Sequence, residues 1–156
     1  MNIENESLAG KRILEVGCGL GRTTRHLVEL TGNQPGAELI VTDVTDRHIE
    51  KIRSGLGDSG KGFRFIQTDA CDLTGVEPES IDYIVCNFAL CEINSVTGNG
   101  TVALARFFSV LKPGGKLFIE EEYPIHQCHN ARQQGWSLMW RVMKSAFILT
   151  SQKTPT

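Results

Sequence analysis

Short apolar runs alternate with segments of helical period along most of the chain, and this alternation restricts the fold more than any other feature. Runs of this length are typical of buried strands, while apolar residues three or four apart mark the helices between them. Strands joined through helices are parallel neighbours, because a parallel pair needs a crossover connection. At 156 residues, the sequence predicts a single α/β domain with a mainly parallel sheet covered by helices on both faces. The predicted strands are 12–16, 39–43, 63–67, 81–86 and 116–120. One helix is predicted at 23–30, a second has Ile49, Ile52 and Leu56 on its apolar face, and a third has Leu104, Phe107, Phe108 and Leu111 on its apolar face.

The segment between the first predicted strand and the first helix is the most informative one. Residues 15–23 read EVGCGLGRT. A strand that runs into GxGxG and then into a helix turns sharply, and a ligand can lie against a backbone that carries no Cβ. Glycine-rich turns are common in this layout, so the loop indicates a ligand site without naming the ligand.

Two acids near this loop restrict the ligand further. The spacing differs from the GxGxxG of nicotinamide and flavin binders, and Glu15 stands two residues before the first glycine. A carboxylate disfavours a pyrophosphate at the helix N-terminus and favours a sulfonium or ammonium group. Asp43 ends the second predicted strand, where an acid can accept hydrogen bonds from ribose hydroxyls. The alternative is that both acids are surface carboxylates at strand ends.

Five segments together resemble a known family. The run ILEVGCGLGRTT (13–24) resembles motif I of the class I, Rossmann-like S-adenosylmethionine-dependent methyltransferases, and VTD (41–43) resembles the acidic segment after it. FIQTDACDL (65–73) is similar to the adenine-recognition segment, IDYIVCNFALCEI (81–93) to the fourth motif, and LKPGGKLFIEE (111–121) to the turn into strand five. The segments keep the family's order over about residues 11 to 122. The resemblance implies a Rossmann-like three-layer sandwich with strand order 3-2-1-4-5.

The resemblance also implies a ligand and the residues that hold it. S-adenosyl-L-methionine would be the cofactor and S-adenosyl-L-homocysteine the product of methyl transfer to an unidentified small-molecule acceptor. Asp69 and the backbone amide of Ala70 match the positions that hold the adenine base in the family. The predicted cofactor-binding residues are Glu15, Gly17, Cys18, Gly19, Gly21, Thr23, Asp43, Val44, Asp69, Ala70, Asn87 and Phe88.

The end of the chain departs from the family pattern. Family members add a final β-hairpin, strands six and seven, whereas nothing after Glu122 supplies two convincing strands. We interpret residues 1–156 as one methyltransferase core domain, truncated or naturally short, in which strand five is an edge that needs cover. An apolar-rich helix predicted at 131–150, with Trp136 and Trp140, would cover this edge or pair with another copy, and we favour a homodimer.

The fourth motif bears on the acceptor but does not single out a catalytic base. DNA-adenine and glutamine methyltransferases carry an Asn-Pro-Pro-aromatic turn where this chain has residues 87–90 (NFAL), which favours a small-molecule acceptor. Four residues are candidates for the base, although each is also expected as a solvated loop residue. They are Glu92, Glu121, Glu122 and His126.

The remaining histidines and cysteines predict no metal site. Residues 126–129 (HQCH) with Cys86 or Cys91 would supply only one compact half of a zinc site. Cys18 is predicted to serve as a small residue in the turn, and His26 and His48 as surface residues of helices.

Composition restricts the location and the partners. A formal net charge of -2 supplies no overall basic field for nucleic acid or an anionic membrane. The longest apolar stretch, 81–93, is interrupted by polar residues and is shorter than the roughly 20 residues of a membrane span. The five cysteines include no CxxC pair, and the first ten residues lack the apolar core of a secretory signal. We therefore predict a cytoplasmic protein with reduced cysteines, no nucleic-acid partner and no membrane partner.

Two other functions remain open. A non-catalytic or truncated S-adenosylmethionine-binding domain would bind the cofactor and transfer no methyl group. A nicotinamide-dependent oxidoreductase is the second alternative, against which the GxGxG spacing, Glu15 and Asp69 all argue.

Overall fold

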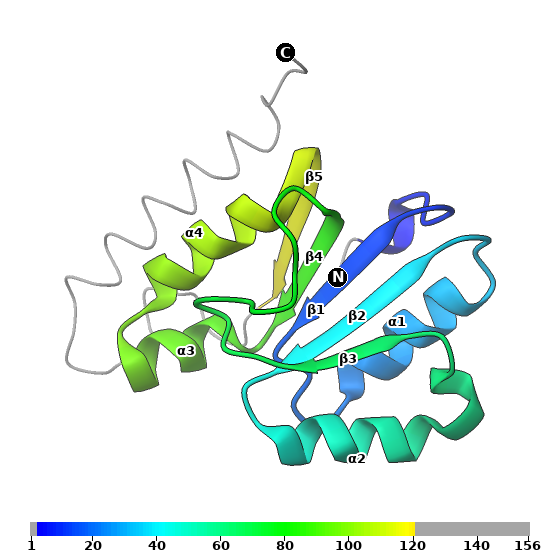
Figure 1. Ribbon diagram of the computed structural model, residues 1–156, viewed down its shortest axis with the longest axis horizontal. Helices are drawn as coiled ribbons and strands as arrows, with labels where there is room; N and C mark the ends of the chain where they lie inside the picture. Colours follow the sequence, from blue (N-terminus) through cyan, green and yellow to red (C-terminus); the bar gives the residue numbers. More distant parts are fainter. Residues whose placement is uncertain (1–2, 121–156) are drawn as a thin grey trace.

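The computed structural model describes residues 3–120 and shows a five-stranded sheet with helices on both sides (Figure 1). Every neighbouring pair of strands is parallel, and the order is β3-β2-β1-β4-β5. Both the α/β class and the predicted strand order are confirmed. The strands are β1 (Arg12–Val16), β2 (Glu38–Asp43), β3 (Arg64–Gln67), β4 (Ile81–Asn87) and β5 (Leu111–Glu120), the α-helices are α1 (Arg22–Gly32), α2 (Asp46–Leu56), α3 (Leu90–Thr97) and α4 (Gly100–Val110), and the 3-10 helices are η1 (Ile3–Asn5) and η2 (Gly57–Gly60).

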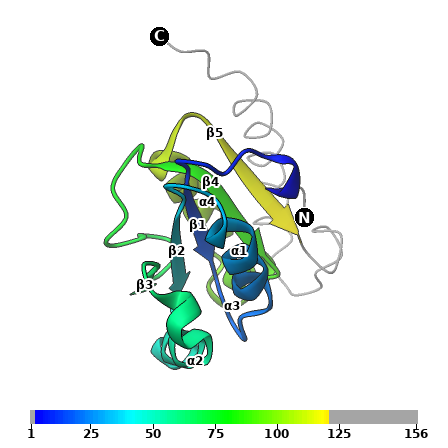
Figure 2. The ribbon, with the colours of Figure 1, turned by 90° about the vertical axis from the view of Figure 1, so that its right-hand side faces the viewer.

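Two separate apolar clusters pack on the two faces of the sheet. Successive residues of a strand point to opposite faces, so Ile13 belongs to one cluster and Leu14 to the other. Helices α1 and α2 contribute to the first cluster, and α4 packs on the second through Leu104 and Phe107. Figure 2 shows the sheet nearly edge-on between these helices. The central strands are buried on both faces, which explains why the sequence shows them as unbroken apolar runs.

The turn into β5 forms an irregularity inside the strand. Ile81 pairs with Leu111 and Tyr83 with Lys116, so the chain between these partners is displaced from the ladder. Gly115 lies in this stretch because an added Cβ would stand 2.9 Å from Leu111 Cδ2 and 3.0 Å from the carbonyl oxygen of Lys112. The regular pairing from Lys116 onward agrees with the predicted strand 116–120.

Helix α3 has no counterpart among the predicted elements. Its eight residues follow β4 after a two-residue link and continue the same apolar stretch, which hides the boundary between strand and helix. The helix ends at Thr97 and is followed by Gly98, whose φ of 72° is the left-handed conformation common after a helix. A stretch this short has too few turns to show a helical period, so a sequence pattern favours reading it as part of the preceding run.

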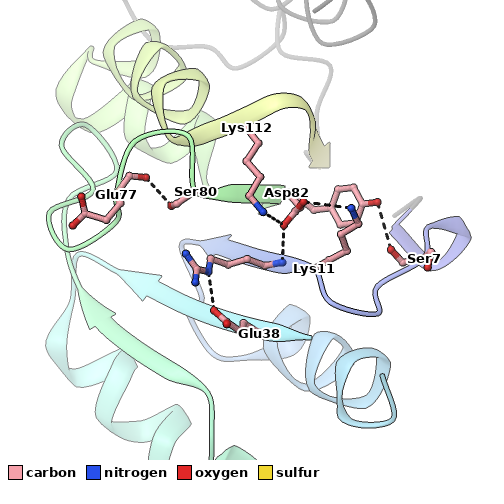
Figure 3. A network of polar contacts seen from close by, with 9 residues as sticks. Ser7, Lys11, Glu38, Glu77, Ser80, Asp82 and Lys112 are labelled. Atoms are coloured by element: carbon pink, nitrogen blue, oxygen red, sulfur yellow. Dashed lines mark hydrogen bonds and ion pairs between the residues drawn. The ribbon is translucent and has the colours of Figure 1, made fainter. Parts of the chain in front are cut away.

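A polar network ties three strands together at the amino end of the sheet (Figure 3). Asp82 accepts hydrogen bonds from the Arg12 amide at 2.9 Å and from the Lys112 ammonium at 2.7 Å, and Lys11 approaches its second oxygen at 3.4 Å. Burial alone would raise the pKa of Asp82, but these donors outweigh it and hold the pKa below its usual value. The network lies opposite the edge at which the predicted ligand residues gather.

Several predictions fall on residues that the structure does not describe. The helix at 131–150, the missing hairpin, Glu121, Glu122 and the histidines and cysteine of 126–129 all lie outside residues 3–120. Among the described residues, no helix is long and apolar enough to cross a membrane. The same residues contain no cluster of three or more histidine, cysteine, aspartate or glutamate side chains suited to a metal ion.

Candidate functional site

The predicted cofactor residues gather at the carboxyl edge of the sheet. All but Thr23, which lies in the first turn of α1, stand near or shortly after the end of β1, β2, β3 or β4, and parallel strands bring these ends to one edge. In sheets of this topology the ligand site is the crevice outside the carboxyl ends, where the strand order reverses. Here the reversal falls between β1 and β4, beside the glycine loop.

The glycine loop uses its backbone amides within the protein. The N–H groups of Gly17 and Cys18 both donate to the Thr42 carbonyl oxygen, at 2.9 and 3.0 Å. The N–H of Gly19 donates to Asp43 Oδ2 at 2.9 Å, and the N–H of Gly21 donates to the Cys18 carbonyl oxygen at 2.8 Å. A loop that binds a pyrophosphate presents its amides to the ligand. These four amides are already engaged, which argues against the nicotinamide alternative.

The three glycines of the loop are needed for different reasons. All have positive φ, at 75°, 49° and 83° for Gly17, Gly19 and Gly21. A Cβ on Gly17 would stand 2.6 Å from the Ala89 Cβ, and one on Gly21 would stand 2.0 Å from Ile52 Cδ1. A Cβ on Gly19 would meet nothing within 4 Å. Packing within the protein therefore explains Gly17 and Gly21, and Gly19 alone faces open space that a ligand can occupy.

Asp43 connects the glycine loop to the start of α2. Its Oδ2 accepts the Gly19 amide, and its Oδ1 accepts the Thr45 amide at 2.8 Å. His48 Nδ1 lies 3.2 Å from the same Oδ1. The side chain is only 7% exposed, which rules out the alternative of an ordinary surface carboxylate. His48 is thus more than the helix surface residue we predicted, since its side chain supports the acid that ends β2.

Glu15 is an acid buried without hydrogen bonds. It is 1% exposed, and neither carboxylate oxygen has a hydrogen-bond partner in the described structure. Burial is the main cause that raises the pKa of Glu15 to about 7, and the negative charge of Asp43 adds to the rise. The neighbouring Thr24 hydroxyl lowers the pKa in part, although it does not reach hydrogen-bond geometry. The Thr24 hydroxyl is likewise buried without a partner. A buried carboxylate of this kind suits a cationic ligand group.

Cys18 lies inside the turn with little access to solvent. Its side chain is buried, and Sγ stands 3.7 Å from Asp43 Oδ2. Burial and then the charges of Asp43 and Glu15 raise the pKa of the thiol well above its usual value. A thiol that stays protonated is a poor nucleophile.

The end of β4 approaches the glycine loop from the other side. Asn87 Nδ2 donates to Thr23 Oγ1 at 3.3 Å and so joins β4 to the first turn of α1. Phe88 has a φ of 56°, and 38% of its surface is exposed. A bulky residue in the left-handed region costs energy and persists only when its surroundings hold it there, a condition common at ligand sites.

The remaining predicted residues follow β2 and β3. Val44 has an exposed side chain directly after Asp43. Asp69 is exposed and its Oδ1 accepts the Cys71 amide at 2.8 Å, while Ala70 is buried. Of the candidate bases, Glu92 lies on the exposed side of α3, and the other three lie outside the described residues.

Thr24 and His48 were not among the predicted site residues. Thr24 stands next to the predicted Thr23, and His48 lies five residues after Asp43 on the first turn of a predicted helix. Their closeness in sequence to predicted site residues was a weak indication that both belong to the site. Only the packing of α1 and α2 against the sheet shows which side chains face the two acids.

Comparison with known proteins assigns the family. The methyltransferase domain family model matches residues 14–117, which is most of the chain. The chain therefore belongs to the methyltransferase domain family, and its fold is that of the S-adenosylmethionine-dependent methyltransferases.

The relatives are named for different methyl acceptors. The chain is 31% identical over 129 residues to phosphoethanolamine N-methyltransferase 1 of Triticum aestivum, covering 82% of this chain and 24% of the relative. It is 33% identical over 119 residues to a tRNA N(3)-cytidine methyltransferase of Homo sapiens, covering 74% and 30%. A solved S-adenosylmethionine-dependent methyltransferase from Aquifex aeolicus shares the fold with a TM-score of 0.69 at 17% identity, covering 92% and 74%. The chain thus spans well under half the length of these two curated relatives.

Proposed function

We propose that the chain is the core of an S-adenosylmethionine-dependent methyltransferase that binds its cofactor at the carboxyl edge described above. The observation that supports this most directly is the combination of an internally bonded glycine loop with the buried, unpartnered carboxylate of Glu15. Such a site suits a ligand that carries positive charge and no phosphate. The proposed contacts are the twelve residues predicted from the sequence, with Glu15 toward the cationic groups, Asp43 toward the ribose, and Asp69 with Ala70 toward the adenine.

The chemistry asks the protein mainly to position its ligands. S-adenosylmethionine, when bound, supplies a methyl group on a positively charged sulfur. Positioning of reactants can contribute up to about 7–11 kcal/mol to lowering a barrier. Here the open backbone at Gly19 and the fixed Asp43 would position the donor, and Asn87 joins the end of β4 to the first turn of α1 beside the glycine loop. An acceptor that loses a proton also needs a base, and no described residue is singled out for that role.

A small-molecule acceptor is our proposal, together with a single-domain, cytoplasmic, homodimeric protein. The acidic net charge and residues 87–90 support the acceptor class. The relatives act on both kinds of acceptor by name, since phosphoethanolamine and tRNA enzymes are both among them. Incubation with radiolabelled cofactor and either a metabolite extract or total tRNA separates the two classes, and label in tRNA would overturn the small-molecule proposal. Light scattering after size exclusion tests the dimer.

The cofactor site is tested by calorimetric titration with S-adenosylmethionine and S-adenosylhomocysteine. Gly19→Val should abolish binding, because the added side chain fills the open space beside the loop. Gly10→Val is the matched control, since Gly10 also has a positive φ of 67° and open space but precedes β1 at the opposite edge. Each substitution costs about 1–2 kcal/mol of backbone strain. Binding by wild type and Gly10→Val, with none by Gly19→Val, supports the site, and equal binding by all three contradicts it.

A non-catalytic cofactor-binding domain remains the second candidate. It shares the cofactor site, so it predicts the same titration results. The two differ only in turnover: a catalytic domain converts S-adenosylmethionine to S-adenosylhomocysteine when the acceptor is supplied, and a binding domain does not.

A further inference from the structure

Glu15 stands in the middle of the sheet, away from any compensating positive charge. It lies on the central strand β1, where it pairs in register with Val41 of β2 and Val85 of β4. The side chain is 1% exposed and its two oxygens lack hydrogen bonds in the described structure. An ionised carboxylate in this environment loses its hydration and gains nothing in return.

The charged group next to Glu15 disfavours its ionisation. Asp43 faces it from the end of β2, and its negative charge is held in place by the Gly19 amide, the Thr45 amide and His48. The thiol of Cys18 faces it from the glycine loop. On α1 the neighbour is the hydroxyl of Thr24, which is uncharged. No lysine, arginine or histidine among residues 3–120 forms an ion pair with Glu15.

We propose that Glu15 carries a proton in the cofactor-free protein near neutral pH and releases that proton to solvent when the positively charged methyl donor binds. The inference rests on the proposed function, because it requires the ligand's ammonium and sulfonium groups to approach this carboxylate. The protonated form matches a buried site with no partner, and the ionised form matches a site that contains a cation. The negative charge of the buried carboxylate is thus neutralised in both states, by the proton without ligand and by the cationic ligand when it is bound. The pKa of about 7 caused by burial agrees with this arrangement.

The size of the effect follows from linkage. With the Glu15 carboxyl half protonated near pH 7, binding should release about half a proton at pH 7 and close to one at pH 6. The apparent Kd for S-adenosylmethionine should rise toward tenfold for each unit of pH below about 6 and level off above about 8. A neutral ligand with the same adenosine, such as methylthioadenosine, should show no release from Glu15.

Proton release is measured by calorimetry in buffers of different ionisation enthalpy, with the full chain and S-adenosylmethionine at pH 6, 7 and 8. Glu15→Gln mimics the protonated acid and should lack this component. Subtracting the variant from wild type removes the contribution of the ligand's own amino group, which is present in both. Thr24→Val should shift the release to higher pH, because it removes the hydroxyl that opposes the rise in pKa.

Infrared difference spectroscopy on wild type gives a second reading that does not depend on a variant binding its ligand. The carbonyl stretch of a protonated carboxyl should be present at pH 7 without ligand and disappear on addition of S-adenosylmethionine. The proton-release inference would be overturned if S-adenosylmethionine binds but the band stays and wild type shows no more buffer-dependent heat than Glu15→Gln. The proposed function would still stand in that case. Absence of binding at every pH would overturn both.

Discussion

Replacement of Glu15 by glutamine is expected to stabilise the cofactor-free protein, and the gain should grow with pH. The folded protein raises the pKa of this carboxyl from its usual 4.5 to about 7, mainly because the group is buried. Between these values the folded state binds a proton that the unfolded state has already lost. Stability is therefore unaffected below pH 4.5, falls as the pH rises, and is fully reduced above about 7.

The magnitude follows from the size of the shift. A difference of about 2.5 pKa units corresponds to about 3 kcal/mol at 1.36 kcal/mol per unit. Glu15→Gln avoids this penalty, so the free energy of unfolding at pH 8 should rise by up to about 3 kcal/mol, and by less than about 1 kcal/mol at pH 5. The buried amide of glutamine lacks hydrogen-bond partners as well, which makes these figures upper values.

Urea unfolding followed by circular dichroism at pH 5 and pH 8 measures the effect. The slope of the free energy of unfolding against urea concentration should be the same for variant and wild type, because the surface exposed on unfolding does not change. Glu29→Gln is the matched control on the exposed side of α1 and should change stability by less than about 0.5 kcal/mol at either pH. A gain that is equal at the two pH values, or a loss that grows with pH, would refute the reasoning and mean that Glu15 is ionised and compensated in the folded protein.

Three other substitutions test packing and polar contacts elsewhere. Gly21→Ala should lower the free energy of unfolding by about 3 kcal/mol, because it combines a positive φ with a Cβ 2.0 Å from Ile52 Cδ1, and an unchanged urea midpoint would contradict this. Asp82→Ala should cost about 2 kcal/mol at pH 7 through loss of charge-assisted hydrogen bonds. Because these contacts hold the pKa of Asp82 below its usual 3.8, the cost should shrink as the pH falls below that value, and a cost that does not change with pH would argue against the ionic contacts. Arg106→Ala should speed amide hydrogen exchange in 72–76, since its guanidinium donates to carbonyl oxygens of this turn, and exchange at the wild-type rate would show that the turn holds without it.

The layout of the fold was predictable largely because its central strands β1, β2 and β4 are buried on both faces. Strands of this kind appear in the sequence as unbroken apolar runs, and the helices between them appear as amphipathic segments. The strand order came from the family resemblance, as periodicity does not specify which strands are neighbours. Helix α3 was missed because it continues an apolar run and is only eight residues long. Helix α1 ends at Gly32, two residues beyond the predicted helix 23–30.

The positions of the predicted site residues were also predictable. Glycines and acids that end or follow strands must reach the same edge once the sheet is parallel, and most of the twelve predicted cofactor residues are of this kind. Their individual roles were not accessible in this way. We attributed the glycines to a ligand lying against the backbone, whereas Gly17 and Gly21 are required by contacts with Ala89 and Ile52. Their roles toward a cofactor stay predictions until binding is measured.

The sequence by itself determined the α/β class, the segments that form the sheet, and the residues that follow each strand, because these depend on local patterns of apolar and small residues. Tertiary structure decided the environment of each site residue. Glu15 and Asp43 are both acids at strand ends, yet one is buried without a hydrogen bond and the other accepts bonds from the loop and from α2. That difference depends on which elements pack around each carboxylate, and burial and charge in three dimensions have no counterpart in a linear pattern.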